Sequence, residues 1–276
     1  MFRRIPFPNR PMTCLLLALV AAAGLSCAPE TATADDSAAE PAFDPASRVH
    51  VSEGSDPKAI EIAQATVEKM GGWQAWDRTR YLSWKFFGGR QHYWDRWTGD
   101  IRIEGKGRDG NEFLFLVNIQ DKQGRAWQGG EEVTDPEALT AAVDGARQMW
   151  VNDSYWLIMP FKLLDPGVTL KYAGEQEMQD GRASDVLELT FDSVGYTPQN
   201  RYHVFVARDT GLVEQWSFFA NASDEEPGYT LPWTGWQTFG EVQIATVHGQ
   251  DRDWQIAVHD DLPASVFESP DPVAGL

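Results

Sequence analysis

The feature of this sequence that most constrains its fold is a long succession of short segments with strand character. Apolar and polar residues alternate over residues 101–104 (Ile-Arg-Ile-Glu), which is typical of a strand with one solvated face. Residues 113–117 are apolar without interruption, which predicts a strand that is covered on both faces. Because glycines separate several of these segments, an antiparallel arrangement with tight turns is expected.

The same pattern continues over most of the chain, and two helices interrupt it. Asp56-Pro57 and Asp135-Pro136 are each an acid followed by a proline, which is a signature of a helix start. Apolar residues at helical spacing follow both pairs, and a dense apolar stretch at residues 152–167 predicts a short helix and a loop. Residues 208–212 carry the signature of a hairpin turn. The predicted strands are residues 80–87, 92–97, 100–105, 112–120, 124–128, 168–173, 185–191, 201–207, 213–219, 235–239, 243–248 and 254–259.

These elements predict a mainly β (α+β) fold: a single antiparallel sheet, curled into a half-barrel and wrapped around two helices. Such architectures often run as one domain of this length, so residues 56–270 are expected to form a single β-rich ligand-binding domain.

The N-terminus has the pattern of an export signal. Arg3, Arg4 and Arg10 are followed by an apolar run from Cys14 to Leu25, which is shorter than the roughly 20 residues of a membrane span. A positive start, a short apolar centre and small residues at the end predict a secretory signal over residues 1–26. The alternative is a membrane anchor that is retained.

Small residues precede Cys27, which resembles the lipobox of bacterial lipoproteins. The resemblance implies that the thiol of Cys27 is acylated after cleavage, whereas ordinary cleavage near residues 21–23 or after Ala28 is the alternative. Cys14 and Cys27 are the only cysteines, so a mature domain can form no internal disulfide. The expected location is therefore outside the cytoplasm, in the periplasm or anchored to the outer membrane. The resemblance to lipoproteins implies that Cys27 is diacylated, and two acyl chains are needed for stable anchoring.

Residues 27–55 are expected to be a disordered acidic tether, since they have no apolar period. The whole chain carries a formal charge of −18, which would repel the phosphates of nucleic acids. The expected partners are a hydrophobic small molecule or lipid and, through the anchor, a membrane. The protein is expected to be a monomer.

No motif for catalysis or metal binding stands out. Residues 105–110 match a dinucleotide fingerprint as a string, but a strand follows them, so a hairpin loop is the better interpretation. The five histidines show no close metal-ligand spacing, and no Gly-x-Ser-x-Gly elbow is present. No cofactor, metal or catalytic residue is therefore predicted.

Twelve tryptophans are the most unusual part of the composition. Aromatic side chains usually build the core, but they also line cavities for apolar ligands. Side chains two residues apart on a strand share a face, which groups several of these aromatics. The predicted ligand-binding residues are Trp84, Phe86, Phe113, Phe115, Trp156, Phe161, Trp216 and Phe218, with residues 155–164 as a lid.

The order of these parts resembles the lipoprotein-carrier superfamily, which includes the periplasmic lipoprotein-localisation carriers and the mycobacterial lipid-carrier lipoproteins. The resemblance rests on the Gly-Gly-Trp at residues 71–73, the Tyr-Trp at 155–156, the Pro-Phe-Lys-Leu at 160–163 and the hairpin at 204–213. These motifs also resemble an uncharacterised bacterial lipoprotein family. The resemblance implies a half-barrel around helices, with a cavity for acyl chains.

The leading hypothesis is a cell-envelope lipoprotein that binds a lipid or acyl chain in an aromatic-lined cavity. Two alternatives remain: an extracytoplasmic hydrolase with acid–base residues from separate strands, and a glycan-binding module. The first requires a buried titratable pair in a cleft. The second requires several exposed, coplanar tryptophans.

Overall fold

The computed structural model describes residues 45–249 and 254–274. The predicted signal peptide, Cys27 and the first part of the predicted tether lie outside these residues. No helix among the described residues is long and apolar enough to cross a membrane.

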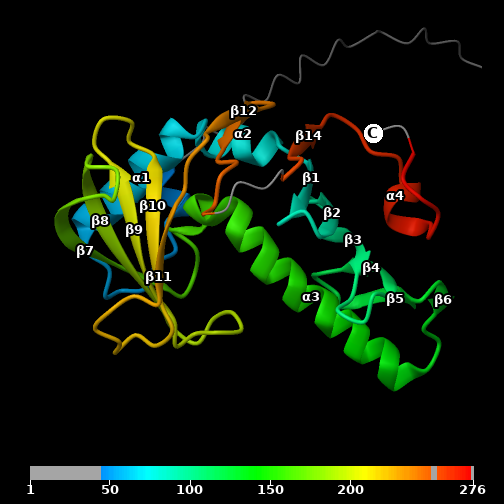
Figure 1. The fold of residues 1–276 in the computed structure, drawn as a ribbon. Helices are drawn as coiled ribbons and strands as arrows, with labels where there is room; N and C mark the ends of the chain where they lie inside the picture. Colours follow the sequence, from blue (N-terminus) through cyan, green and yellow to red (C-terminus); the bar gives the residue numbers. More distant parts are fainter. Residues whose placement is uncertain (1–44, 250–253, 275–276) are drawn as a thin grey trace, which may run out of the picture. The chain divides into compact units, whose positions relative to one another are not determined.

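The first large element is a seven-stranded antiparallel sheet with the order β14-β1-β2-β3-β4-β5-β6 (Figure 1). Its pairing places Leu82 opposite Trp94 and Trp94 opposite Ile101, and all three side chains are buried. Because opposite residues share a face, this face forms one side of the core. The strands are β1 (Tyr81–Phe86), β2 (Arg90–Asp95), β3 (Asp100–Lys106), β4 (Glu112–Asn118), β5 (Gln123–Gln128), β6 (Glu131–Glu132) and β14 (Ala257–His259).

The second large element is a five-stranded antiparallel sheet with the order β11-β10-β9-β8-β7. The predicted hairpin at residues 208–212 is confirmed, because Ala207 and Leu212 are hydrogen-bonded across the turn between β9 and β10. Its strands are β7 (Val168–Glu177), β8 (Ala183–Phe191), β9 (Arg201–Ala207), β10 (Val213–Phe219) and β11 (Tyr229–Pro232). β12 (Gln237–Phe239) and β13 (Val242–Ile244) form a separate pair.

The predicted class, a mainly β fold of open antiparallel sheets with few helices, is confirmed. The sequence analysis expected a single sheet, whereas the structure divides the strands between two large sheets and one two-stranded pair. The two sheets contribute to one hydrophobic core, in which Trp84 of β1 and Trp216 of β10 both take part.

The short helices lie before, between and after the sheets. α1 (Pro57–Lys69) buries Ala63 and Val67, as its spacing predicts, and Gly71 with a φ of 112° turns the chain into α2 (Gly72–Arg78). The turn needs glycine, because a Cβ on residue 71 would lie 2.5 Å from the carbonyl oxygen of Glu241. The other short elements are α4 (Ser265–Glu268) and 3₁₀ turns at Pro45–Arg48 and Met159–Lys162.

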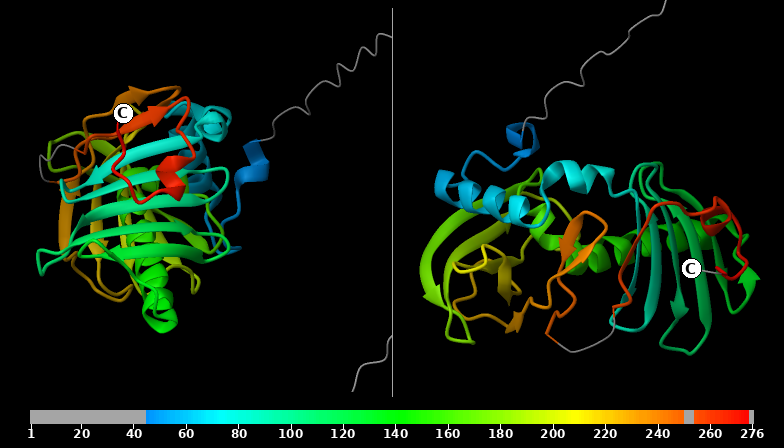
Figure 2. Two further views of the ribbon diagram at one scale, coloured as in Figure 1. Left: turned by 90° about the vertical axis from the view of Figure 1, so that its right-hand side faces the viewer. Right: turned by 90° about the horizontal axis from the view of Figure 1, so that it is seen from above.

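The long helix α3 (Pro136–Ile158) corrects the prediction for residues 152–158, which continue the helix and form no separate one. Asp135 caps its start, since the side chain accepts a hydrogen bond from the backbone N–H of Ala138 at 2.9 Å. Pro160 then lies in the 3₁₀ turn that follows, where a proline is tolerated. α3 extends from the seven-stranded sheet toward the five-stranded sheet (Figures 1 and 2).

Asp56 does not cap α1 with its side chain, although the sequence predicts an acidic cap there. Its carboxylate instead accepts a hydrogen bond from the backbone N–H of Tyr172 and pairs with Lys171 on β7. The backbone of Ser52 and Asp56 also donates to carbonyls of β7. Ordered contacts therefore begin within the segment that the sequence assigned to the tether, and they cover part of an open sheet edge.

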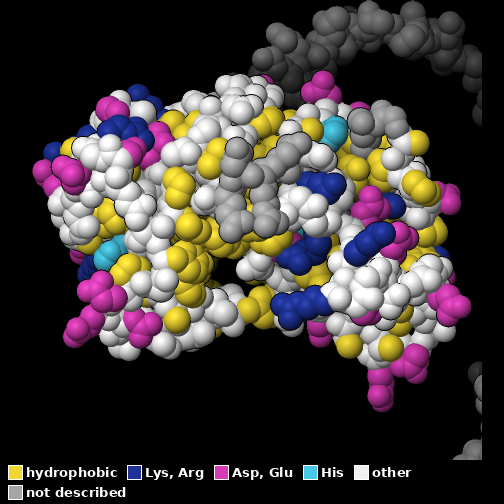
Figure 3. All heavy atoms as spheres, in the orientation of Figure 1, with side chains coloured by type: hydrophobic (Ala, Val, Ile, Leu, Met, Phe, Trp, Pro, Cys, Tyr) yellow, Lys and Arg dark blue, Asp and Glu magenta, His cyan; other side chains and the backbone are white. Residues whose placement is uncertain are grey.

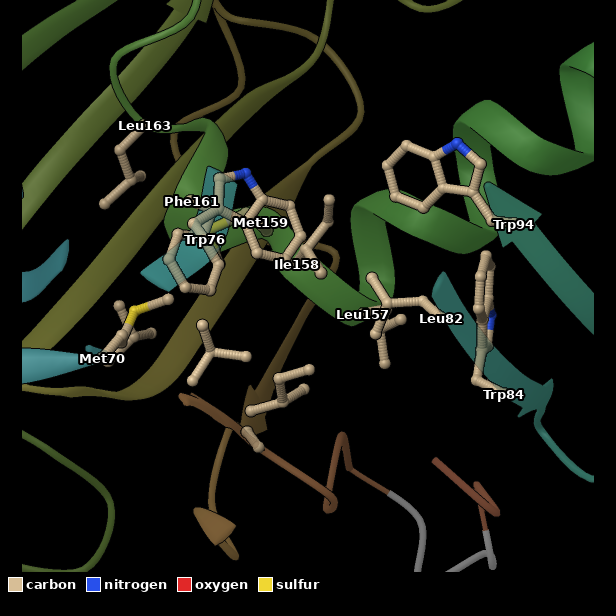
Figure 4. Packing of buried hydrophobic residues seen from close by; sticks show 14 of the residues in the cluster. Met70, Trp76, Leu82, Trp84, Trp94, Leu157, Ile158, Met159, Phe161 and Leu163 are labelled. Atoms are coloured by element: carbon tan, nitrogen blue, oxygen red, sulfur yellow. The ribbon is translucent and has the colours of Figure 1, made fainter. Parts of the chain in front are cut away.

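The core between the helices and the sheets is rich in large side chains. Figure 4 shows Trp76 beside Phe161 near α2, and Trp84 and Trp94 beside Leu157 of α3. Trp84, Trp216, Trp233 and Trp254 are fully buried. Much of the interior that the half-barrel hypothesis leaves open is therefore occupied by the protein's own aromatic rings.

Candidate functional site

A continuous series of aromatic rings crosses from one sheet to the other over α3. Phe87, in the turn after β1, packs edge-on against Trp156 of α3 with ring centroids 5.3 Å apart. Trp156 contacts Trp216 of β10 at 4.7 Å, and Trp216 stacks on Tyr202 of β9 at 5.2 Å. These edge-to-face and offset contacts are the favoured geometries of aromatic pairs.

The series extends at both ends. Tyr202 contacts Phe218 at 5.6 Å, and Phe218 stacks on Tyr229 of β11 at 4.9 Å. At the other end Phe86 contacts Phe87 at 4.7 Å. Trp216 is buried and Tyr229 is 38% exposed, while the others are half-buried. We refer to these residues as the aromatic strip: Phe86, Phe87, Trp156, Tyr202, Trp216, Phe218 and Tyr229.

The surface is hollowed beside the strip's elements. Figure 3, in the orientation of Figure 1, shows a hollow near the middle of the molecule, between β11 and α3. Hydrophobic side chains gather along its left margin, and Lys and Arg side chains lie beyond its right margin. An apolar concavity with a few polar groups nearby is the usual form of a small-molecule site.

The structure brings together four of the eight predicted ligand-binding residues. Phe86, Trp156, Trp216 and Phe218 all belong to the aromatic strip. The other four lie elsewhere: Trp84 stacks on His92 at 4.4 Å, Phe161 on Trp76 at 4.3 Å, and Phe113 on Phe115 at 5.1 Å.

Three members of the strip were missed by the sequence analysis. The sequence analysis placed Phe87 at the end of the predicted strand 80–87, on the face opposite to Phe86, whereas the strand ends at Phe86 and Phe87 lies in the turn with a positive φ of 45°. Tyr202 lies opposite Phe218, and Phe218 lies opposite Tyr229. Such neighbours follow from strand pairing, and the sequence does not specify the register of β11.

Two further cavities lie outside the strip. The larger, of about 900 Å³, lies on the outer face of the seven-stranded sheet, where Arg102 donates hydrogen bonds to the backbone carbonyls of Val266, Ser269 and Asp271. The smaller, of about 260 Å³, lies beside His259 and Arg80. The larger cavity is lined by Lys85, Gly88, Gly89, Gln91, Arg102, Glu104, Gly105, Lys106, Glu112, Phe113, Leu114, Trp127, Gly130, Pro270, Asp271, Pro272 and Val273.

A buried ionic group fixes α3 against β2. Asp153 of α3 accepts hydrogen bonds from the Arg90 guanidinium, both at 2.7 Å, and from Nε2 of His92 at 2.8 Å. Burial raises the pKa of the Asp153 carboxyl, but the bonds from His92 and Arg90 outweigh it and lower that pKa overall. Burial is the largest effect on His92 and lowers its pKa, so the ring is neutral near pH 7.

This group lies away from the two cavities described above. His92 and Asp153 are fully buried, and neither lines the two cavities. The hydrolase alternative requires such a pair within a cleft, so the pair gives it no support. In the described ranges, no three His, Cys, Asp or Glu residues are placed to hold a metal ion.

The glycan-binding alternative requires an array of exposed tryptophans. Trp97 is 59% exposed, and no other tryptophan in the described part of the chain reaches that class of exposure. Arg80 lies over its ring at 4.9 Å, and its indole N–H donates to the backbone carbonyl of Asp77. The array that sugar stacking needs is therefore absent from the described residues.

Comparisons with known proteins show only distant likeness. No family model and no curated protein matches the sequence. A crystal structure of a DUF1329 family protein from Desulfovibrio piger is 14% identical, with a TM-score of 0.40, and the match covers 78% of this chain and 98% of that one. A crystal structure of MucB is 17% identical, with a TM-score of 0.25, covering 69% of this chain and 66% of that one. A crystal structure of MucB in complex with MucA(peri) is 14% identical, with a TM-score of 0.22, covering 68% and 62%.

These similarities define no family. The class of the protein therefore rests on its own structure, a mainly β protein of open antiparallel sheets with an aromatic strip between them.

The buried histidines make stability depend on pH. Burial lowers the pKa of His248 to about 3 and also lowers the pKa values of His92 and His259. The unfolded chain then binds more protons than the folded one as pH falls below about 6.5, so stability decreases in that direction. Each histidine contributes up to about 1.4 kcal/mol per pH unit.

We predict that His248→Phe weakens this dependence. Between about pH 6.5 and pH 5 the wild-type protein should lose roughly 2 kcal/mol more of its unfolding free energy than the variant does. Urea unfolding at a series of pH values measures the difference. The control variant is His50→Phe, which replaces an exposed histidine in the same way. Identical slopes for wild type and His248→Phe would contradict the prediction.

Proposed function

We propose that the protein binds an apolar ligand, a lipid or acyl chain, in the hollow beside the aromatic strip. The observation that carries the proposal is the strip itself: seven linked rings on both sheets and α3, most of them half-buried. Rings that only fill a core are normally fully covered, as Trp84 and Trp233 are. A continuous partly exposed apolar surface in a concave place is typical of a ligand or partner site.

The energetics favour a long apolar chain. Burial of each methylene group contributes about 0.8 kcal/mol, so a chain along the strip would gain several kcal/mol from contact with the rings. The ring edges and faces present no charge of their own, and the Arg90 guanidinium beside Phe86 is already paired with Asp153. The strip therefore fits the hydrocarbon part of a ligand.

The cellular location is part of the same proposal. An export signal over residues 1–26 and acylation of Cys27 would hold the folded domain at a bacterial membrane, in the periplasm or at the outer membrane. The protein would then act as a stationary acceptor for lipids.

Trp156 is the residue whose removal tests the site most selectively, because this side chain of α3 contacts both Phe87 and Trp216. We expect Trp156→Ala to weaken binding of the fluorescent fatty acid cis-parinaric acid about tenfold, through the loss of aromatic contact area. Titration of the purified protein with this probe measures the effect.

Trp97→Ala is the matched control, since Trp97 is an exposed tryptophan that does not belong to the aromatic strip. It should leave the affinity unchanged. Equal affinities for wild type and Trp156→Ala, in proteins with the same unfolding midpoint, would refute the proposed site.

The anchor is tested separately in a bacterial host. Labelling with radioactive palmitate should mark the wild-type chain and Cys14→Ser, and it should not mark Cys27→Ser. The Cys27→Ser protein should also leave the membrane fraction, because a chain without acyl groups has no anchor of this kind. Labelled Cys27→Ser protein would show that acylation occurs elsewhere.

A further inference from the structure

Four buried rings contact one another in series, and the first of them, Trp216, also belongs to the aromatic strip. Trp233 is 5.8 Å from Trp216 and 4.3 Å from His248, and His248 is 4.4 Å from Trp254, between ring centroids. All four side chains are almost completely shielded from solvent. We refer to Trp216, Trp233, His248 and Trp254 as the buried indole cluster.

The nitrogen atoms of this cluster lack hydrogen-bond partners in the described part of the structure. They are Nε1 of each tryptophan and both ring nitrogens of His248. Other indoles differ: Nε1 of Trp236 and of Trp97 donate to backbone carbonyls at 3.0 Å, whereas Nε1 of Trp84, Trp94 and Trp150 also lack partners among the described residues. Buried polar groups are nearly always hydrogen-bonded, and a group of unpartnered donors in one place points to a missing acceptor.

The chemistry of the cluster selects the kind of acceptor. An indole nitrogen can only donate, and a neutral imidazole donates from one nitrogen. Burial lowers the pKa of His248 to about 3, so the ring is neutral near pH 7. Among the described residues, the cations that stack on tryptophans lie on Trp73, Trp76, Trp94, Trp97 and Trp127, and none lies on this cluster.

A buried carboxylate would need a cation, and an ammonium group would need acceptors. The cluster therefore suits an uncharged acceptor, such as the carbonyl of an ester or amide. Its position suits the same ligand: Trp254 contacts Phe86 and Phe87 at 5.6 and 5.1 Å, and Trp216 contacts Trp156 at 4.7 Å. Because all four cluster rings are buried, neighbouring rings must move for a carbonyl to reach their N–H groups.

We propose that the buried indole cluster anchors the uncharged carbonyl group of the ligand, an ester or amide, while the hydrocarbon chain lies along the aromatic strip. This inference rests on the proposed function and adds the chemical class of the ligand. The preference for an ester over a plain hydrocarbon comes from donors that gain a partner only when the carbonyl is present.

The experiment compares methyl laurate, lauric acid and an alkane of similar length as competitors of cis-parinaric acid on the full chain near pH 7. Methyl laurate is expected to bind about tenfold more tightly than the alkane and more tightly than the ionised acid. Trp233→Phe, which keeps an aromatic ring and removes the N–H, should reduce the advantage of the ester over the alkane. Trp84→Phe is the matched control, because Trp84 is equally buried, also lacks a partner for its N–H, and lies outside the cluster.

The outcomes separate this inference from the proposed function. If none of the three compounds displaces the probe, the proposed function itself fails. If ester and alkane bind the wild-type protein equally, the apolar site stands and the carbonyl anchor is refuted. The N–H groups of the cluster would then form no hydrogen bond with the ester carbonyl. The wild-type comparison remains decisive even if Trp233→Phe does not fold.

Discussion

The arrangement of this protein depends on the contact between Asp153 of α3 and two residues of β2. The carboxylate is fully buried and accepts from Arg90 and His92, so any other placement of the helix would leave charges without partners in the core. Breaking a buried pair of this kind typically costs about 3–5 kcal/mol. The pair therefore fixes both the position of α3 along its axis and its rotation about that axis relative to the seven-stranded sheet. Three residues further along, that rotation directs Trp156 toward Trp216 of the five-stranded sheet.

The aromatic strip is thus a consequence of one anchored helix between two sheets. Behind it, Trp84, Trp233 and Trp254 fill the interior, and in front of it the rings of Phe87, Tyr202 and Phe218 remain only half-covered. The ligand space that we propose is accordingly shallower than an empty half-barrel, and its inner wall is made of indoles. That wall is apolar in area but carries N–H groups, which is why the proposed ligand combines a hydrocarbon chain with an uncharged carbonyl.

The sequence predicted the strands and their antiparallel class well, because alternation and turn residues report local geometry. The prediction was wrong at residues 152–158. The dense apolar stretch before Pro160 was interpreted as a separate short helix, but these residues form the last two turns of α3. For the site, Trp156 and Trp216 could be named because aromatic side chains often line cavities for apolar ligands, and on a strand the face of each side chain follows from the local period. Asp153 could not be identified as an anchor, since an acid on a helix is normally solvated and only the fold brings Arg90 and His92 opposite it. Tyr202 and Tyr229 enter the site through strand register, which depends on distant pairing.

Native mass spectrometry of the full chain, gently purified from a bacterial host, tests the central claim most directly. The account predicts a population heavier than the acylated polypeptide by the mass of one lipid, which is released at higher collision energy and is greatly reduced in Trp156→Ala. A single population at the polypeptide mass, unchanged after incubation with an acyl ester, would contradict it.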